Sequence, residues 1–205
     1  LFAFSVSQIL GSLVLGIISA KYDHKIGGRS KQMGYINILA GVIAFLAFFA
    51  GGSGPVVVLI VFIAEGFFSA CFWLHGWDVA IDASKIELYQ KGEDRSCEYT
   101  AFIGFAFKLG GAIGMWLVGI TLQLFEFNGE AAAQSALALK GIEVVFYIIS
   151  GICLTAGGLV FMKSPLTRKK LDALLAGIEK KKRGEAVDES EFSDLLSGAG
   201  KGKRG

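Results

Sequence analysis

The sequence is poor in charge and in proline. Only 19% of its 205 residues are Asp, Glu, Lys or Arg, and it has 2 prolines against 28 glycines. A soluble domain of this length carries a larger charged fraction, so the composition indicates a lipid environment. Many glycines beside few prolines suit closely packed membrane helices better than loops. The net charge of +2 is too small to indicate a nucleic-acid partner.

Sequence features of catalytic and metal sites are also missing. Cys71, Cys97 and Cys153 lack metal-ligand spacing and are interpreted as packing residues. There is no His-Glu-x-x-His motif and no serine–histidine arrangement of a hydrolase. We therefore expect no enzymatic activity, no catalytic residue, no metal and no cofactor. The chain begins at Leu1, inside an apolar run without an n-region, which suggests a fragment of a longer protein.

Long apolar runs dominate what is present. A bilayer core of ~30 Å needs about 20 apolar residues in a helix. The stretches that meet this requirement are residues 1–20, 33–52, 55–81, 99–125 and 141–162. The sequence therefore predicts an all-α membrane protein, with a transmembrane bundle of five spans over residues 1–162.

The connections between these spans alternate in charge. Basic residues follow the first, third and fifth spans: Lys21, Lys25, Arg29 and Lys31, then Lys85, Lys91 and Arg95, then Lys163, Arg168, Lys169 and Lys170. The link GGSGP is uncharged, and EFNGEAAAQSALALK has one lysine against two glutamates. Because basic loops stay in the cytoplasm, we expect the C-terminus to be cytoplasmic. The predicted location is a plasma or inner membrane.

The chain changes character after the last span. Residues 163–183 place apolar side chains at helical spacing beside a basic face: Leu166, Leu171, Leu174, Leu175 and Ile178. This pattern predicts an amphipathic cytoplasmic helix, which either lies on the anionic inner leaflet or packs, solvated, beneath the bundle. Residues 184–205 are polar and rich in glycine, and they are predicted to be a disordered tail.

Lys108 is the most unusual residue in the apolar runs. It lies nine residues after Tyr99, or ~14 Å into its span. A lysine at that depth costs roughly 2.5–3.5 kcal/mol on insertion scales, so it should face a cavity or a carboxylate. Glu65, ~15 Å after Pro55, has a matching depth and is one partner, and Asp78 is another. Lys108 either forms a static pair or lines a polar pathway and exchanges partners, and Glu65 either pairs or faces interhelical water.

Two indoles lie on one face of the third span. In CFWLHGWDVAID, Trp73 and Trp77 are one helical turn apart. Indoles either stack on a sugar ring or anchor a helix at the membrane interface. Trp77 is nearer the cytoplasmic end and suits anchoring, whereas Trp73, ~6 Å deeper, is the better ligand candidate. His75 between them is either a proton relay or a histidine that satisfies a local hydrogen bond.

Two of the predicted cytoplasmic loops carry more than a topological signal. In AKYDHKIGGRSKQ, Asp23 is placed to cap or pair across a helix end, although the loop also suffices as a positive-inside signal. The loop DASKIELYQKGEDRSCEY mixes acids and bases more densely than topology requires. It forms either ion pairs that open and close or a solvated linker.

These loops and spans resemble a known family. DHKIGGRSK between two spans is similar to the loop signature of the major facilitator superfamily. With FWLHGWDVAID, KGEDRSCEYTAFIGFAFKLGGAIG and PLTRKKLDALLAGIEKKK, the chain resembles the glycoside–pentoside–hexuronide:cation symporter family, the melibiose permease-like group. The resemblance covers roughly residues 16–182 and is most specific in the interval from Arg95 to Lys108 and in the Pro-Leu-Thr tail. It implies roughly the last five of about twelve helices of a major facilitator-type bundle.

The resemblance also implies roles for particular residues. Trp73 would contribute to the sugar pocket, Asp82 would join Arg95 in an inner-surface charge network, and Lys108 would face cation-binding carboxylates of an absent N-terminal half. The predicted substrate-binding residues are Trp73, Trp77, Lys108 and Glu65. The predicted coupling and charge-network residues are Lys108, Asp78, Asp82, Arg95, Asp23 and Arg29.

The chain departs from the family pattern at two places. Many members carry a second acid three residues after the Asp82 position, where this chain has Lys85, with Glu87 two residues later. Glu65 is not part of the family pattern. The predicted function is cation-coupled symport of a sugar or glycoside by alternating access, with sodium or a proton as the coupling cation. The predicted partners are the sugar, membrane lipid and the N-terminal half.

Two other functions fit the same features. One is a related carrier of a lipid or amphipathic metabolite, which an apolar pocket with Glu65 would suit. The other is a non-transporting membrane sensor or scaffold whose charged tail recruits a partner. Substrate-dependent counterflow separates the carriers from the sensor.

Overall fold

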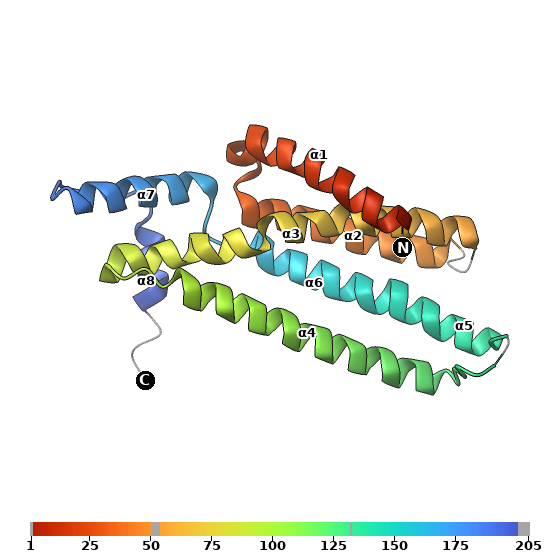
Figure 1. Ribbon diagram of the computed structural model, residues 1–205. Coiled ribbons are helices and arrows are strands. Elements are labelled where there is room, and N and C mark those ends of the chain that lie inside the picture. The colour runs from red at the N-terminus through yellow and green to blue at the C-terminus, as the bar shows by residue number, and fades with distance from the viewer. Residues whose placement is uncertain (1, 51–53, 132, 201–205) are drawn as a thin grey trace.

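The described chain is a bundle of long helices joined by short connections (Figure 1). The computed structural model describes residues 2–50, 54–131 and 133–200, with side chains as far as residue 197. The elements are α1 (Phe2–Ile26), α2 (Arg29–Phe49), α3 (Pro55–Lys91), α4 (Ser96–Leu124), α5 (Ala136–Glu143), the π-helix η1 (Val144–Ile149), α6 (Ser150–Met162), α7 (Arg168–Lys182) and α8 (Ser193–Gly200). No strand occurs in these ranges, and the all-α prediction is confirmed.

Five of the described helices are long and apolar enough to cross a membrane, with α5, η1 and α6 forming one continuous rod. They correspond to the five spans of the membrane bundle that the sequence predicts. Part of the GGSGP link after α2, and the last two residues of the span predicted over 33–52, lie outside the described residues.

The third span is much longer than the sequence predicts. α3 has 37 residues, or about 55 Å at 1.5 Å per residue, against a bilayer core of ~30 Å. The predicted span ends at residue 81, but the helix continues to Lys91 and stops at Gly92, whose φ of 75° ends the last turn. The C-terminal part of α3 therefore projects beyond the bundle beside α7 (Figure 1). We call this side of the molecule the α7 end.

Glycines let the long helices approach closely in pairs. A Cβ on Gly66 of α3 would lie 2.5 Å from the Phe4 carbonyl oxygen of α1. A Cβ on Gly158 of α6 would lie 2.8 Å from the Gly34 carbonyl oxygen of α2. Real side chains do not tolerate such distances, so these two helix pairs depend on the missing Cβ atoms, as membrane helix interfaces often do.

Leucine at Gly41 should separate α2 from α6. Its side chain would collide with the Thr155 hydroxyl and the Gly151 carbonyl group, and overpacking of this kind costs about 1–3 kcal/mol. We expect a clearly lower midpoint in a thermal unfolding assay of the detergent-solubilised protein. Gly157→Leu is the matched control, because a Cβ there meets no atom within 4 Å. Equal midpoints for the two variants would contradict this packing.

α4 packs differently from the other long helices. Within the described residues it has no buried side chain, and its main contacts are with α3 and α5. Figure 1 shows it running apart from the helix pairs over most of its length. A Cβ on Gly110, Gly111 or Gly114 would meet nothing within 4 Å. The close helix approach that these small residues favour is therefore not made by the described part of the chain.

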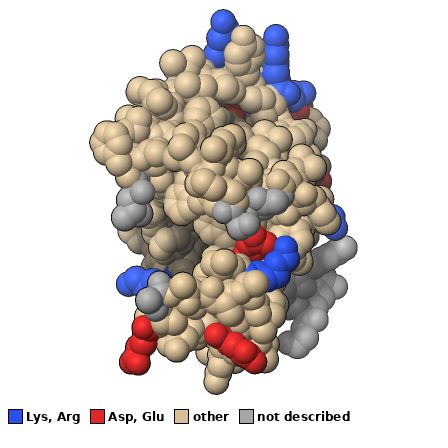
Figure 2. All heavy atoms as spheres, turned by 90° about the vertical axis from the view of Figure 1, so that its right-hand side faces the viewer, with Lys and Arg blue, Asp and Glu red and all other residues tan. Residues whose placement is uncertain are grey.

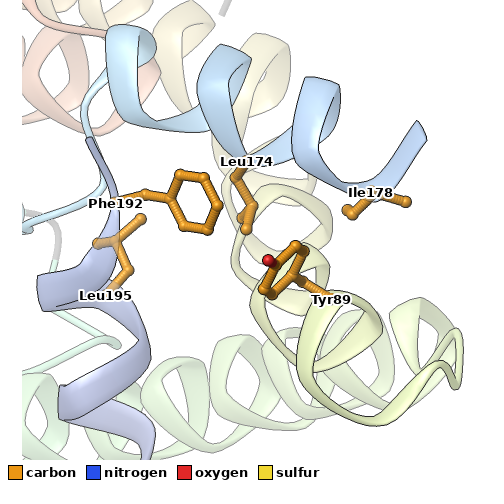
Figure 3. Packing of buried hydrophobic residues seen from close by; sticks show 5 residues of the cluster. All are labelled: Tyr89, Leu174, Ile178, Phe192 and Leu195. Atoms are coloured by element: carbon orange, nitrogen blue, oxygen red, sulfur yellow. The ribbon is translucent and has the colours of Figure 1, made fainter. Parts of the chain in front are cut away.

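The C-terminal segment forms a compact structure at the α7 end. Five side chains, which we call the tail core, pack together from α3, α7 and the α8 region: Tyr89, Leu174, Ile178, Phe192 and Leu195 (Figure 3). The predicted tail helix is α7, and it contacts α3 and α1. The prediction of disorder from residue 184 is wrong for the described part of that segment. Two apolar residues in a polar sequence, Phe192 and Leu195, are almost fully buried and fix it on α7.

Ion pairs reinforce the docking of the tail. Because acid protonates their carboxylates, the docking should weaken at low pH. Lys170 bonds Asp194 at 2.5 Å and holds the pKa of that carboxyl below its usual value. A carboxylate with a depressed pKa stabilises the folded state above its unfolded pKa, and this contribution disappears as the pH falls through the folded pKa. We therefore expect the tail to be docked at neutral pH and to loosen below about pH 4.

The fluorescence anisotropy of a dye attached at Ser197→Cys, in a background without the other cysteines, measures this release. In Lys170→Ala the carboxyl loses its partner, so the tail should dock more weakly at neutral pH and the release at low pH should be a smaller step than in the parent protein. Superimposable pH profiles would show that the Lys170–Asp194 pair does not hold the tail.

Candidate functional site

An aromatic cluster joins α3 to α4 in the middle of the molecule. Phe72 and Phe107 stack with ring centroids 5.5 Å apart, and Trp73 meets Phe107 edge-on at 6.0 Å. Trp73 is nevertheless 55% exposed. One edge of this indole is held by neighbouring rings while much of its surface stays open for a ligand.

Lys108 lies on the edge of this cluster. It follows Phe107 and is one turn beyond Gly104, whose Cβ position is 3.6 Å from the Trp77 ring. Residues four apart share a helix face, so Lys108 lies on the stripe of α4 that begins against α3. Its side chain is exposed. The structure thus places Lys108 and Trp73 at the same level of the bundle.

The other two predicted substrate residues have different surroundings. Trp77 packs on Gly104, which gives it a structural role between α3 and α4. Glu65 lies eight residues before Trp73 on α3, about 12 Å along the helix, and is partly buried. Among the ion pairs of the described residues none joins Glu65 to Lys108, so that predicted contact is not made in this conformation.

A charge network lies at the α7 end of the bundle, where α1, α2, α3 and α7 meet. The Arg29 guanidinium at the start of α2 contacts Asp82 of α3, Nη1 to Oδ2, at 2.8 Å. Its Nε lies 3.5 Å from an oxygen of Asp78, one turn away on the same helix. Both Arg29 and Asp82 are largely shielded from solvent, with 28% and 17% of their side chains exposed. Arg29 therefore fastens α2 to two consecutive turns of α3.

A glycine turn connects this network to α7. Gly27 and Gly28 have φ values of 96° and 99°, which favour glycine, and both N–H groups donate to the Asp23 carbonyl oxygen. The Arg168 N–H donates to the Gly27 carbonyl at 3.3 Å, and its guanidinium contacts Asp23 at 3.3 Å. A Cβ on Gly28 would lie 2.9 Å from the Arg168 nitrogen. The loop DHKIGGR is therefore a docking site for the start of α7.

Two members of this network, Arg168 and Asp172, are not among the predicted site residues. Arg168 was interpreted only as part of the basic tail, and Asp172 was not considered. Asp172 pairs with Arg168 at 3.0 Å and with His24 at 3.5 Å. The spacing of an arginine and an aspartate four residues apart on a predicted helix was the available signal.

Arg95 belongs to a different cluster from the one that the resemblance implied. Asp82 pairs with Arg29, whereas Arg95 contacts Glu87 at 3.4 Å and Glu98 at 2.5 Å. The reason is the length of α3. Nine further helical residues, about 14 Å, separate Asp82 from the last residue of that helix, and Arg95 lies beyond it.

The opposite end of the bundle is apolar. Figure 2, which looks onto the α5 end, shows a surface with few charged side chains. A cavity of about 320 Å³ lies between α3, α5 and η1 and is lined mainly by apolar residues: Val58, Phe62, Leu139, Ile142, Phe146 and Tyr147, with Glu143. Lys140 pairs with Glu143 at 2.7 Å. This cavity has the character of a site for an apolar group beside a charged one.

The described residues contain no group of three or more His, Cys, Asp or Glu side chains arranged to hold a metal ion. The two clusters offer groups for ligand binding and for ion pairing. Trp73 offers an aromatic face at the level of Lys108 in the bundle, and the network around Arg29 offers ion pairs that join separate helices.

Comparison with known proteins gives a family match and one relative. A family model described as MFS/sugar transport protein matches residues 1–168. A protein of Pseudescherichia vulneris, described as an uncharacterized 29.9 kDa protein in the crtE 3' region, is 28% identical over 147 residues, which are 71% of this chain and 53% of that protein. The chain therefore spans about half the length of this curated relative. No solved structure matches.

Proposed function

Because the chain belongs to the MFS/sugar transport protein family, an integral membrane family of transporters rather than enzymes, we propose that it forms part of a secondary active transporter of a sugar or glycoside. Transport would occur by alternating access around a central site, coupled to sodium or a proton. The observation that carries this proposal is the half-exposed Trp73, held by Phe72 and Phe107 beside Lys108.

Each group in this cluster has a role in the proposed cycle. The Trp73 indole would stack on the apolar face of a sugar ring. Lys108 would exchange partners between the substrate site and cation-binding carboxylates on an N-terminal half, which the exposed face of α4 would contact. A mid-membrane ammonium with no described carboxylate beside it suits such a partner from elsewhere.

The charge network would close the cytoplasmic side. Basic residues gather in the connections at the α7 end, and this bias supports placing that end and the C-terminus in the cytoplasm of a plasma or inner membrane. Arg29 joins α2 to Asp78 and Asp82 of α3. Formation and loss of these pairs would accompany closing and opening at that side.

One observation favours a second candidate. The cavity of about 320 Å³ beside α5 is mainly apolar, with the Lys140–Glu143 pair beside it. An amphipathic or lipid-like substrate would place its apolar part in such a cavity. A membrane sensor, the third interpretation, is an outcome of the test below.

Trp73→Ala should raise the half-saturating sugar concentration about fivefold. A ring contact contributes about 1 kcal/mol, and 1.4 kcal/mol corresponds to a factor of ten. The measurement is counterflow of glycosides, pentoses and hexuronates in proteoliposomes with the complete transporter. Trp116→Ala is the control, because that indole is farther along α4.

An unchanged affinity in Trp73→Ala would reject the pocket, and exchange of amphipathic compounds alone would favour the second candidate. No exchange of either class would leave the sensor.

A further inference from the structure

His75 is buried without the hydrogen bond that a histidine in a helix usually makes. Only 4% of its surface is exposed, and neither ring nitrogen has a hydrogen-bond partner among the described residues. The interpretation of His75 as a locally satisfied histidine is therefore not supported. A buried imidazole without a partner is costly unless it binds something in another state of the protein.

The helical spacing places His75 in line with the acids of the charge network. Asp78 and Asp82 lie three and seven residues after His75 on α3, so the three side chains share one face of the helix. Arg29 contacts the two acids at 3.5 and 2.8 Å. His75 is thus one turn from Asp78, whose contact with Arg29 is the longer of the two.

The charges around His75 come from three helices. Burial, and then Arg29 at the start of α2, disfavour a positive charge on His75, whereas Asp78 on α3 and Asp23 at the end of α1 favour one. The remaining titratable neighbour on α3, one turn before His75, is the buried Cys71 thiol. A neutral imidazole has one N–H donor, and a protonated imidazole has two and a full charge.

We propose that His75 is a proton-binding site that competes with Arg29 for Asp78. The imidazole accepts one proton from water at the α7 end, and the imidazolium donates an N–H to the Asp78 carboxylate. Arg29 then pairs with Asp82 but no longer with Asp78, so one of the two links between α2 and α3 is released. The one covalent bond that forms is the N–H bond between the proton and the imidazole ring.

Only the role of His75 in coupling rests on the proposed transport function. If the chain transports, the proton is the coupling cation that acts at the cytoplasmic closure, since protonation of His75 weakens the network that holds α2 to α3. The protonation and the change of partner are properties of the chain that exist without a substrate. Histidine suits this role because its ordinary titration range spans physiological pH.

The experiment follows the two histidines of the chain by nuclear magnetic resonance. The complete protein, labelled with ¹⁵N in the imidazole rings and held in lipid nanodiscs, is titrated between pH 4 and 9. The signal that disappears in His75→Gln belongs to His75, and the one that disappears in His24→Gln belongs to His24. We expect the His75 signal to titrate within this range. In Asp78→Asn the curve should move to lower pH by about one unit, because the imidazolium loses its counter-charge.

Asp172→Asn is the matched control, since Asp172 contacts His24 rather than His75. It should move the His24 curve and leave the His75 curve in place. A His75 signal that stays constant from pH 4 to 9 would overturn the proposal, and so would a His75 curve that Asp78→Asn leaves unchanged. Titration with the expected shifts, in a protein that exchanges no sugar, would establish the proton site and reject only the proposed sugar transport.

Discussion

Lys108→Ala should abolish coupled sugar uptake while the protein still inserts and folds. The lysine belongs to a helix that has no buried side chain among the described residues, so its removal leaves no cavity in the described bundle. Loss of one member of a desolvated charge pair typically costs ~2–5 kcal/mol. The expected decrease in uptake is therefore at least about thirtyfold. Uptake into membrane vesicles, normalised to the amount of inserted protein, measures it.

A control variant distinguishes the loss of Lys108 from the loss of any lysine charge in the chain. Lys169→Ala removes a lysine that is 77% exposed and pairs with Glu191, whose side chain is 54% exposed. Its uptake should stay near that of the parent protein, because exposed pairs contribute little. Uptake by Lys108→Ala at the parent rate would reject the role of Lys108, whatever the control shows.

Charge reversal at Arg29 or Asp82 should have the second largest effect. Arg29→Glu would face Asp78 and Asp82 with a third acid, and Asp82→Arg would face Arg29 with a second guanidinium. Because these side chains are mostly shielded, we expect each single variant to lose at least about tenfold in uptake. The double variant restores one opposite-charge pair and should recover part of the activity.

Thermal unfolding and uptake of the four proteins form a double-mutant cycle. A coupling free energy of about 1 kcal/mol or more is expected for this pair. The same exchange between Arg183 and Glu179, whose side chains are 63% and 73% exposed, should show almost none. Additive effects at Arg29 and Asp82 would mean that the pair does not link α2 to α3 during transport.

The sequence was sufficient for the parts of the fold that depend on apolar length. Five spans follow from counting apolar residues, since helix geometry and bilayer thickness allow few alternatives. The depth of Lys108 and the shared face of Trp73 and Trp77 follow from the helical period. The structure adds that Phe107 holds Trp73 from α4, a contact between helices that no period in a single helix reveals.

Other features depend on distances that the sequence does not contain. Asp82 and Arg95 are close in sequence, yet the extra turns of α3 separate them, and Arg29 from another helix takes the position of partner. The tail was predicted to be disordered because its composition is polar. Two apolar side chains, Phe192 and Leu195, suffice to dock it, since α3 projects far enough to offer Tyr89 as a surface (Figure 3).

The central claim is that the Lys108 ammonium borders a water-filled route through the transporter. The most direct test is the reactivity of Lys108→Cys in sealed vesicles of the complete protein, with the native cysteines replaced by alanine. A membrane-impermeant, charged thiol reagent is applied from each side, with and without sugar. The account predicts modification from at least one side, at a rate that sugar changes. A thiol at this position that stays unmodified from both sides under every condition would contradict it.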